Sequence, residues 1–279
     1  MFFLFLNGKK QGVSLFVIFA QMIRVTRFIH KHHFSILILF TMIWQERTAL
    51  LLGQDRVEKL NRSHVLIVGL GGVGATAAEM LCRAGIGHLT IVDADVVHPT
   101  NINRQLPALH STIGKSKALV SKDRLQDINP EAEIIALTEF LKNERTETLL
   151  TKTRFDFVVD AIDSISPKVY LLYHCCRKQI PVVSAMGAGG KVNLADIRQA
   201  DISDTYQCAL AKVVRKRLKE LGIDKGIPVV FSPEPVRKNV IIEVDEPNKR
   251  SSAGTVSYAP IVFGCYLSEY VIKGIICLP

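Results

Sequence analysis

The chain has 279 residues, which is long enough to bury the core of one large α/β domain, and its formal net charge is +9. Its six cysteines include no C-x-x-C pair, so we expect neither a zinc site nor a thioredoxin-like pair, and their irregular spacing excludes a disulfide framework. A surplus of cations is by itself a weak argument for a polyanionic partner, and we expect no DNA partner.

The first 41 residues differ in composition from the rest of the chain. They alternate apolar runs with basic and histidine clusters and contain no acidic residue. None of the apolar runs reaches the roughly 18–20 residues that span a bilayer. We interpret residues 1–41 as a leader or as sequence before a true start at Met42, and residues 42–279 as the folded domain. We therefore expect a cytoplasmic protein, associated with a membrane only if residues 1–41 form a surface anchor.

From Arg47 onward the patterns of strand and helix alternate. This alternation predicts a Rossmann-like, doubly wound α/β fold, with a mainly parallel sheet and helices on both faces. The predicted strands are short apolar runs, at 65–68, 89–92, 133–137, 155–159, 181–184 and 229–231. The predicted helices cover 47–60, 73–84, 114–128, 144–151, 167–177 and 209–221.

The pattern is looser in the C-terminal third. Residues 191–197 are predicted to form a further strand, and the polar, proline-broken residues 232–250 a mobile loop. The apolar end of the chain, 259–276, predicts a helix. Because Glu269 and Lys273 interrupt it at i,i+4 spacing, we expect this helix to dock on the domain and not to span a membrane.

The run from His64 to Gly74, His-Val-Leu-Ile-Val-Gly-Leu-Gly-Gly-Val-Gly, predicts a nucleotide site. A buried strand ends in glycines with the G-x-G-x-x-G spacing, and the helix that follows points its N–H groups at an anion. The glycines expected to line the site are Gly69, Gly71, Gly72 and Gly74. Nineteen residues after the last of them comes Asp93, whose carboxylate can accept the ribose hydroxyls. This pattern alone leaves NAD, FAD and ATP open, and with NAD a dehydrogenase.

Further polar residues are expected at the same edge of the sheet, because a ligand of an open parallel sheet lies beyond the carboxyl ends of its strands. They are the segment 101–105 (Asn-Ile-Asn-Arg-Gln), the pair Asp160 and Asp163 after a predicted strand, and Lys117 one turn into a helix. For Asp160 the alternative is that it only caps or braces the strand end.

Five motifs in this order resemble the ThiF/MoeB/HesA superfamily, the ATP-dependent adenylating enzymes related to ubiquitin-activating enzyme. They are Gly-Leu-Gly-Gly-Val-Gly, Asp-Ala-Asp, Asn-x-Asn-Arg-Gln, Gly-Lys-Ser-Lys and Asp-Ala-Ile-Asp, and the resemblance runs from about Trp44 to the end of the chain. It implies ATP as the cofactor, with Asp93 on the ribose. It also implies a homodimer, in which Arg47 reaches the phosphates bound by the partner subunit.

The resemblance also assigns the residues that act on the phosphates. It implies that Asn103, Arg104 and Lys117 bind ATP, with Arg104 and Lys117 on its phosphates, and that Asp163 holds Mg²⁺. These roles agree with the chemistry of adenylation. A carboxylate that attacks the α-phosphate builds negative charge on the phosphoryl oxygens and the departing pyrophosphate, which fixed cations and a magnesium ion stabilise. Arg47, Arg104, Lys117 and Asp163 are accordingly the expected catalytic residues.

Departures from the pattern narrow the subfamily. The zinc pairs of the sulfur-carrier-activating members are absent, and Val229 stands where some relatives have a cysteine. The segments 160–168, 184–190 and 230–232 look most like tRNA threonylcarbamoyladenosine dehydratases. This implies ATP-dependent ring closure of threonylcarbamoyladenosine in tRNA, through an acyl-adenylate captured by a nitrogen of the substrate. The alternative is an adenylyltransferase for the C-terminus of a small ubiquitin-like sulfur-carrier protein, with a carrier or sulfur-transfer protein as partner.

The predicted helix 209–221 supports an RNA substrate independently. Its cations share one face at i, i+3, i+4 and i+7, and they are Lys212, Arg215, Lys216 and Lys219. Its apolar residues lie on the opposite face, and they are Leu210, Val214, Leu218 and Leu221. Such a row of cations predicts contacts to the tRNA backbone; the alternative is an ordinary solvated face.

Overall fold

The computed structural model describes residues 44–246 and 249–278. The chain divides into two units, residues 1–47 and 48–279, and the fold described below is that of the second. The helix α2 (Glu46–Leu52) begins in the first unit. The predicted boundary between residues 41 and 42 lies outside the described residues.

The second unit is built on a seven-stranded sheet in the order β3-β2-β1-β4-β5-β7-β6. Its strands are β1 (His64–Val68), β2 (His88–Val92), β3 (Glu133–Leu137), β4 (Phe157–Asp160), β5 (Val182–Ala185), β6 (Arg198–Asp201) and β7 (Pro228–Phe231). All neighbours pair in parallel except β6, which pairs antiparallel with β7. The predicted Rossmann-like fold is confirmed. The strand order reverses between β1 and β4, where such a sheet opens a crevice beyond its carboxyl ends.

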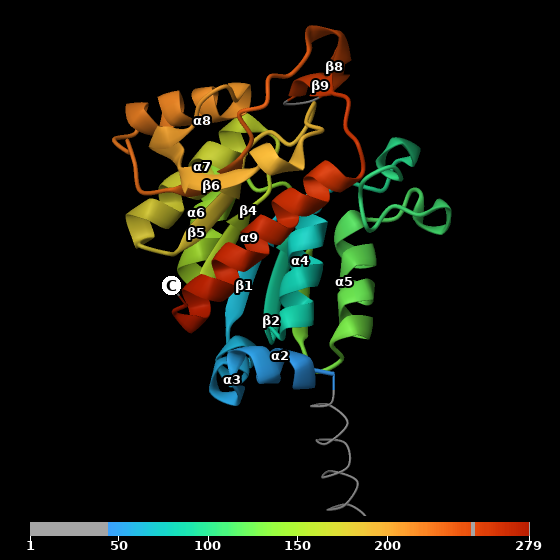
Figure 1. The fold of residues 1–279 in the computed structure, drawn as a ribbon, viewed down its shortest axis with the longest axis vertical. Helices are drawn as coiled ribbons and strands as arrows, with labels where there is room; N and C mark the ends of the chain where they lie inside the picture. The colour runs from blue at the N-terminus through green and yellow to red at the C-terminus, as the bar shows by residue number, and fades with distance from the viewer. Residues whose placement is uncertain (1–43, 247–248, 279) are drawn as a thin grey trace, which may run out of the picture. The chain divides into compact units, whose positions relative to one another are not determined.

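Helices cover both faces of this sheet (Figure 1). They are α4 (Gly74–Ala84), α5 (Lys117–Ile128), α6 (Asn143–Lys152), α7 (Ile165–Lys178), α8 (Ala209–Glu220) and α9 (Tyr258–Ile276), while α3 (Gln54–Asn61) lies beyond the amino ends of β1 and β2. Along β1, Val65 and Ile67 pack with α4, α5 and α9, while Leu66 and Val68 pack with the core under α6, α7 and α8. Successive side chains of a strand point to opposite faces, so both faces of a central strand must be apolar.

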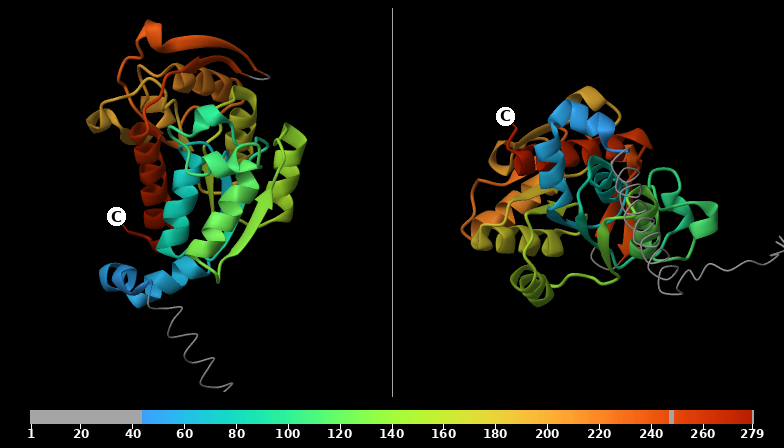
Figure 2. Two further views of the ribbon diagram at one scale, coloured as in Figure 1. Left: turned by 90° about the vertical axis from the view of Figure 1, so that its right-hand side faces the viewer. Right: turned by 90° about the horizontal axis from the view of Figure 1, so that it is seen from below.

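The C-terminal helix α9 packs directly against α4, and the two run side by side in Figure 1 and in the left view of Figure 2. Small residues allow this close approach: a Cβ at Gly264 would lie 2.6 Å from the carbonyl oxygen of Val73. The hydroxyl of Ser268 donates to the carbonyl of Ala77 over 3.3 Å. By length and composition α9 could cross a membrane, but half of the segment is buried against the domain. Its contacts are those of a core helix, as the sequence predicted.

Four predicted segments differ from the structure. The helix predicted over 47–60 is two helices, α2 and α3, because Gly53 between them has a φ of +90°, which is not helical. The helix predicted from residue 114 begins only at Lys117, after Gly114 with a φ of +79°.

Residues 191–197 are not a strand: the Asn193 side chain accepts from the N–H of Ala195 and so starts the short turn η3 (Leu194–Asp196). The edge strand begins only afterwards, as β6. The expected mobile loop 232–250 contains parts of an antiparallel pair, β8 (Ile241–Glu246) and β9 (Lys249–Ala253). Composition missed this pair because the pairing of two strands is a contact between segments that residue content does not record.

We predict that Gly264→Ala destabilises the protein, because the added methyl group meets backbone on one side and Thr76 on the other. Over-packing of this kind costs about 1–3 kcal/mol. Urea denaturation followed by circular dichroism measures the change. The matched control is Cys265→Ala, at an exposed position of the same helix, which should leave the midpoint close to that of the wild type. An unchanged midpoint for Gly264→Ala would show that α4 and α9 can separate at little cost.

Candidate functional site

The glycine loop lies where the strand order reverses. Gly69 follows β1 directly and has a φ of +90°, and a Cβ there would lie 2.7 Å from the carbonyl oxygen of Ala161, which follows β4. A Cβ at Gly74 would overlap the carbonyl of Gly69, so both positions require glycine. By contrast, a Cβ at Gly71 would find no heavy atom closer than 3.8 Å, the Nε2 of Gln105. The loop thus offers backbone to a ligand at the start of α4, which carries no side-chain cap.

Asp93 is fixed against this loop. One carboxylate oxygen accepts the N–H of Leu70 over 2.6 Å, and the other accepts the N–H of Asp95 over 2.8 Å. Burial raises the pKa of Asp93, and the positive charge of Lys117 and the two N–H donors oppose that rise. Each oxygen can accept a further hydrogen bond, so the carboxylate fits the ribose role.

The positive charge of Lys117 acts on the carboxylate of Asp93. This lysine is the first residue of α5 and is buried, and its ammonium lies 2.9 Å from a carboxylate oxygen of Asp95. Its backbone N–H donates to the carbonyl of Asp95, which holds the helix start against the segment after β2. The nearby Lys115 is exposed. The Asp95 partner is a feature that the sequence analysis did not identify, although it is the last residue of the Asp-Ala-Asp motif.

The segment 101–105 packs against the glycine loop, since a Cβ at Gly72 would lie 2.8 Å from the carbonyl oxygen of Arg104. The half-buried Arg104 donates to the side-chain oxygen of Asn103 over 2.8 Å. Burial lowers the pKa of Arg104, and the negative charge of Asp163 opposes this. The amide nitrogen of Asn103 donates to the carbonyl of Thr255, just before α9.

Gln105 is a further candidate that sequence analysis included only as part of a motif. It is 9% exposed, and its Oε1 has no hydrogen-bond partner among the described residues. A buried acceptor left unpaired costs free energy that a donor on a bound ligand would recover. Its amide faces the open side of Gly71, so this donor would belong to a molecule held by the glycine loop.

Asp160 and Asp163 separate into different environments. Asp160 is fully buried, lies 2.6 Å from the ammonium of the equally buried Lys168, and accepts from the hydroxyl of Ser184. It also accepts the N–H of Ile162 over 3.1 Å and so fixes the turn that carries Asp163. The alternative reading of Asp160 as a brace is therefore correct. Nothing in the sequence marked Lys168 as its partner, because the contact depends on how α7 packs on β4 and β5.

Asp163 is exposed at the crevice, three residues beyond β4. The described residues contain no group of three or more His, Cys, Asp or Glu side chains placed to hold a metal ion. Mg²⁺ commonly uses one or two carboxylates and completes its shell with water and substrate phosphates, and Asp163 fits that mode.

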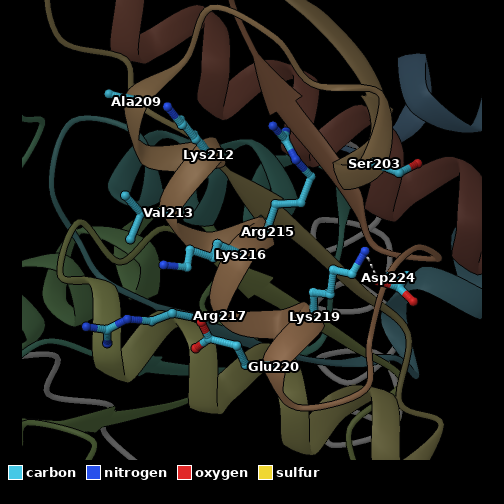
Figure 3. Close-up of a pocket in the computed structure, with 10 residues that line it drawn as sticks. All are labelled: Ser203, Ala209, Lys212, Val213, Arg215, Lys216, Arg217, Lys219, Glu220 and Asp224. Carbon is cyan, nitrogen blue, oxygen red and sulfur yellow. Dashed lines mark ion pairs between the residues drawn. The ribbon is translucent and has the colours of Figure 1, made fainter.

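The cations of α8 are not equivalent (Figure 3). Lys212 and Lys216 are exposed. Lys219 forms an ion pair with Asp224 at 3.8 Å. Arg215 is half-buried, and its guanidinium donates to the carbonyl of Thr205 over 2.8 Å. Of the expected apolar face, Val214 and Leu218 are buried, whereas Leu221 is exposed. The role predicted for Arg47 stays a prediction, because this residue lies in the first unit.

Together, the glycine loop at the β1/β4 reversal, the fixed Asp93 and the ion pair of Lys117 with Asp95 are the features of a nucleotide-binding α/β domain. The sequence profile of the ThiF family matches residues 45–277, and the chain belongs to this family.

Its relatives include dehydratases acting on a modified tRNA base. The chain is 40% identical over 238 residues to the tRNA threonylcarbamoyladenosine dehydratase of Bacillus subtilis, covering 82% of this chain and 93% of that protein. The crystal structure of the Escherichia coli enzyme, TcdA, in complex with ATP superposes with a TM-score of 0.76 at 34% identity, covering 84% of this chain and 95% of that one. The sulfur carrier protein ThiS adenylyltransferase of Escherichia coli is 36% identical over 140 residues, only 50% of this chain and 55% of that protein.

We predict that Lys117→Ala raises the pKa of Asp93 further, because it removes the positive charge that opposes the effect of burial. Titration of the side-chain carboxyl carbons by NMR measures the shift. Lys115→Ala is the matched control, since this exposed lysine lies two residues away and should leave the Asp93 titration in place. A pKa that stays constant or falls in Lys117→Ala would contradict the electrostatic coupling.

Proposed function

We propose that this chain is an ATP-dependent tRNA threonylcarbamoyladenosine dehydratase. The observation that carries the proposal is the identity of 40% over nearly the whole length of the Bacillus subtilis dehydratase, in a chain whose glycine loop, Asp93 and Arg104 converge at one crevice. The substrate would be tRNA, and the nucleotide ATP.

The proposed reaction has two steps. An oxygen of the threonyl carboxylate attacks the α-phosphorus of ATP, and pyrophosphate leaves with the electron pair of the broken P–O bond. A nitrogen of the same modified base then attacks the activated acyl carbon, its proton is lost, and AMP leaves with the former carboxylate oxygen. The base has lost the elements of water, and ATP has been converted to AMP and pyrophosphate.

In this reaction the residues of the crevice hold the nucleotide, and its cations stabilise the negative charge that builds on the phosphates. Asp93 accepts the ribose hydroxyls, and the glycine loop, Asn103, Arg104 and Lys117 bind the nucleotide, with the two cations at its phosphates. Asp163 would hold Mg²⁺, which, when bound, neutralises charge on the phosphate oxygens. The buried Asp160–Lys168 pair positions Asp163 through the turn at Ile162.

The alternative substrate is the C-terminus of a small sulfur-carrier protein. The similarity to the carrier-activating enzyme covers half of this chain, whereas that to the dehydratase covers 82%. At the position where some relatives have a cysteine, Val229 lies fully buried in β7. Both observations favour tRNA. An NAD-dependent dehydrogenase explains neither the segment 101–105 nor Lys117. A non-catalytic nucleotide-binding subunit would not need Arg47, Arg104, Lys117 and Asp163, all of which are present.

We further propose a cytoplasmic homodimer in which Arg47 completes the site bound by the partner subunit. Arg47 precedes the first strand, at the position where the resemblance to the superfamily implies an arginine that crosses the dimer.

The test of the function is ring closure by the purified protein. With ATP, Mg²⁺ and tRNA containing threonylcarbamoyladenosine, we expect nucleoside mass analysis to show the loss of one water, with AMP and pyrophosphate formed in step. Asp163→Asn should lower the rate by about 10²-fold or more, since it removes a charge at the transferring phosphate. If the tRNA stays unmodified while a Gly-Gly-ended carrier protein becomes adenylated, the alternative is correct.

The lysines of α8 generate a separate prediction. Lys212→Ser with Lys216→Ser should weaken tRNA binding and flatten its dependence on salt, because each phosphate contact contributes roughly 0.7–0.9 to the slope of log K against log salt. Filter binding over a range of KCl concentrations measures the slope. The control is Lys152→Ser with Arg177→Ser, which removes the same charge from exposed positions at the C-terminal ends of α6 and α7. Equal slopes for the two double variants would assign α8 an ordinary solvated face.

A further inference from the structure

Tyr206 is an aromatic side chain at the edge of the sheet that the proposed reaction does not use. It is 50% exposed. Its ring meets that of Phe231 edge-on, with the centroids 5.8 Å apart. Phe231 is the last residue of β7, and β7 runs parallel to β5. Tyr206 therefore lies at the carboxyl edge of the sheet, the edge at which the candidate active site opens.

Several contacts hold Tyr206 in this position. Arg198, the residue opposite Phe231 in β6, donates to the Tyr206 hydroxyl over 3.3 Å and pairs with Asp196 at 3.8 Å. On the other side, Arg215 donates to the carbonyl of Thr205, the preceding residue. The half-buried cation of α8 thus fixes the turn that presents the tyrosine. An aromatic ring that is both rigid and exposed loses little conformational entropy when a ligand covers it.

The surroundings of Tyr206 join the active site to the basic helix. α8 begins three residues later, and the sulfur of Cys208 lies 3.8 Å from a Cβ built at Gly187, in the loop after β5. The start of α8 is therefore packed against the loop that follows β5, at the carboxyl edge of the sheet. Lys212 and Lys216 follow one and two turns further along the helix and are exposed.

From this arrangement we propose that Tyr206 is a stacking platform for an unpaired base of the RNA substrate. A neighbour of the base that enters the crevice stacks on the exposed part of the ring, while Lys212 and Lys216 contact the phosphates. Proteins that bind single-stranded RNA combine these two elements, since a base has an aromatic face whatever its sequence. The identity of the RNA as the tRNA substrate rests on the proposed function. The stacking contact rests on the exposure and the fixed position of Tyr206.

The experiment measures binding of an anticodon stem-loop RNA that contains threonylcarbamoyladenosine. Tyr206→Ala should raise the Kd and the KM for RNA about tenfold, the size expected for one lost base–aromatic contact, with an unchanged salt slope. Tyr206→Phe and Tyr206→Trp should retain most of the affinity. Tyr170→Ala is the matched control, at a tyrosine 37% exposed on α7.

A fluorescence measurement keeps the test independent of any loss of stability. Trp44 is the only tryptophan of the chain, so Tyr206→Trp in a Trp44→Phe background reports from position 206 alone. RNA should quench this fluorescence. Absence of quenching, or equal RNA affinity of Tyr206→Ala and the wild type, overturns the proposal. So does a Tyr206→Phe variant as weak as Tyr206→Ala, since the ring would then not be the contact.

The same samples separate this inference from the function on which it partly rests. If the wild type closes the ring but binding is insensitive to Tyr206, the stacking contact alone is wrong. If RNA binding depends on Tyr206 but no ring forms, the dehydratase proposal alone is wrong. A wild type that binds no RNA, or a dependence on Tyr206 seen only with a Gly-Gly-ended carrier protein, overturns the stacking proposal whatever the ring-closure assay gives.

Discussion

The close approach of two backbones at the β1/β4 reversal is the constraint on which the site depends. A Cβ at Gly69 would lie 2.7 Å from the carbonyl oxygen of Ala161, so the chain can leave β1 beside β4 only with a glycine there. This contact brings the start of α4 next to the turn that carries Asp163. It also leaves Leu70 where its N–H reaches Asp93. An added methyl group would therefore disturb the nucleotide loop and the carboxylates on both sides of it.

Close helix packing on one face of the sheet and a buried ion pair on the other hold the structure around this reversal. On one face, α9 lies against α4 through small residues such as Gly264. On the other, Lys168 reaches from α7 to the buried carboxylate of Asp160. Loss of either partner of such a pair leaves an uncompensated charge and costs about 3–5 kcal/mol. Because Asp160 also accepts the N–H of Ile162, this pair holds the turn that carries Asp163.

The lysines and arginines differ in function because they differ in environment. Lys117 is buried beside two acids at the crevice, whereas Lys168 is buried as a structural partner. On α8, Arg215 turns inward to hold the segment of Tyr206, and Lys212 and Lys216 remain exposed. A helical wheel assigns Arg215 and Lys216 to one face, yet only contacts with neighbouring elements decide which cation meets solvent.

The sequence by itself determined the order of strands and helices up to β5 and the place of the glycine loop, because periodicity and glycine spacing are local properties of the chain. It also determined the nucleotide motif containing Asp93. Only the tertiary structure decided that 191–197 turns before the edge strand forms and that 241–253 contains a pair of strands. The same holds for the partner of Asp160 and for the aromatic surface at Tyr206. These features depend on contacts between distant segments, and no short-range pattern records which segments will meet.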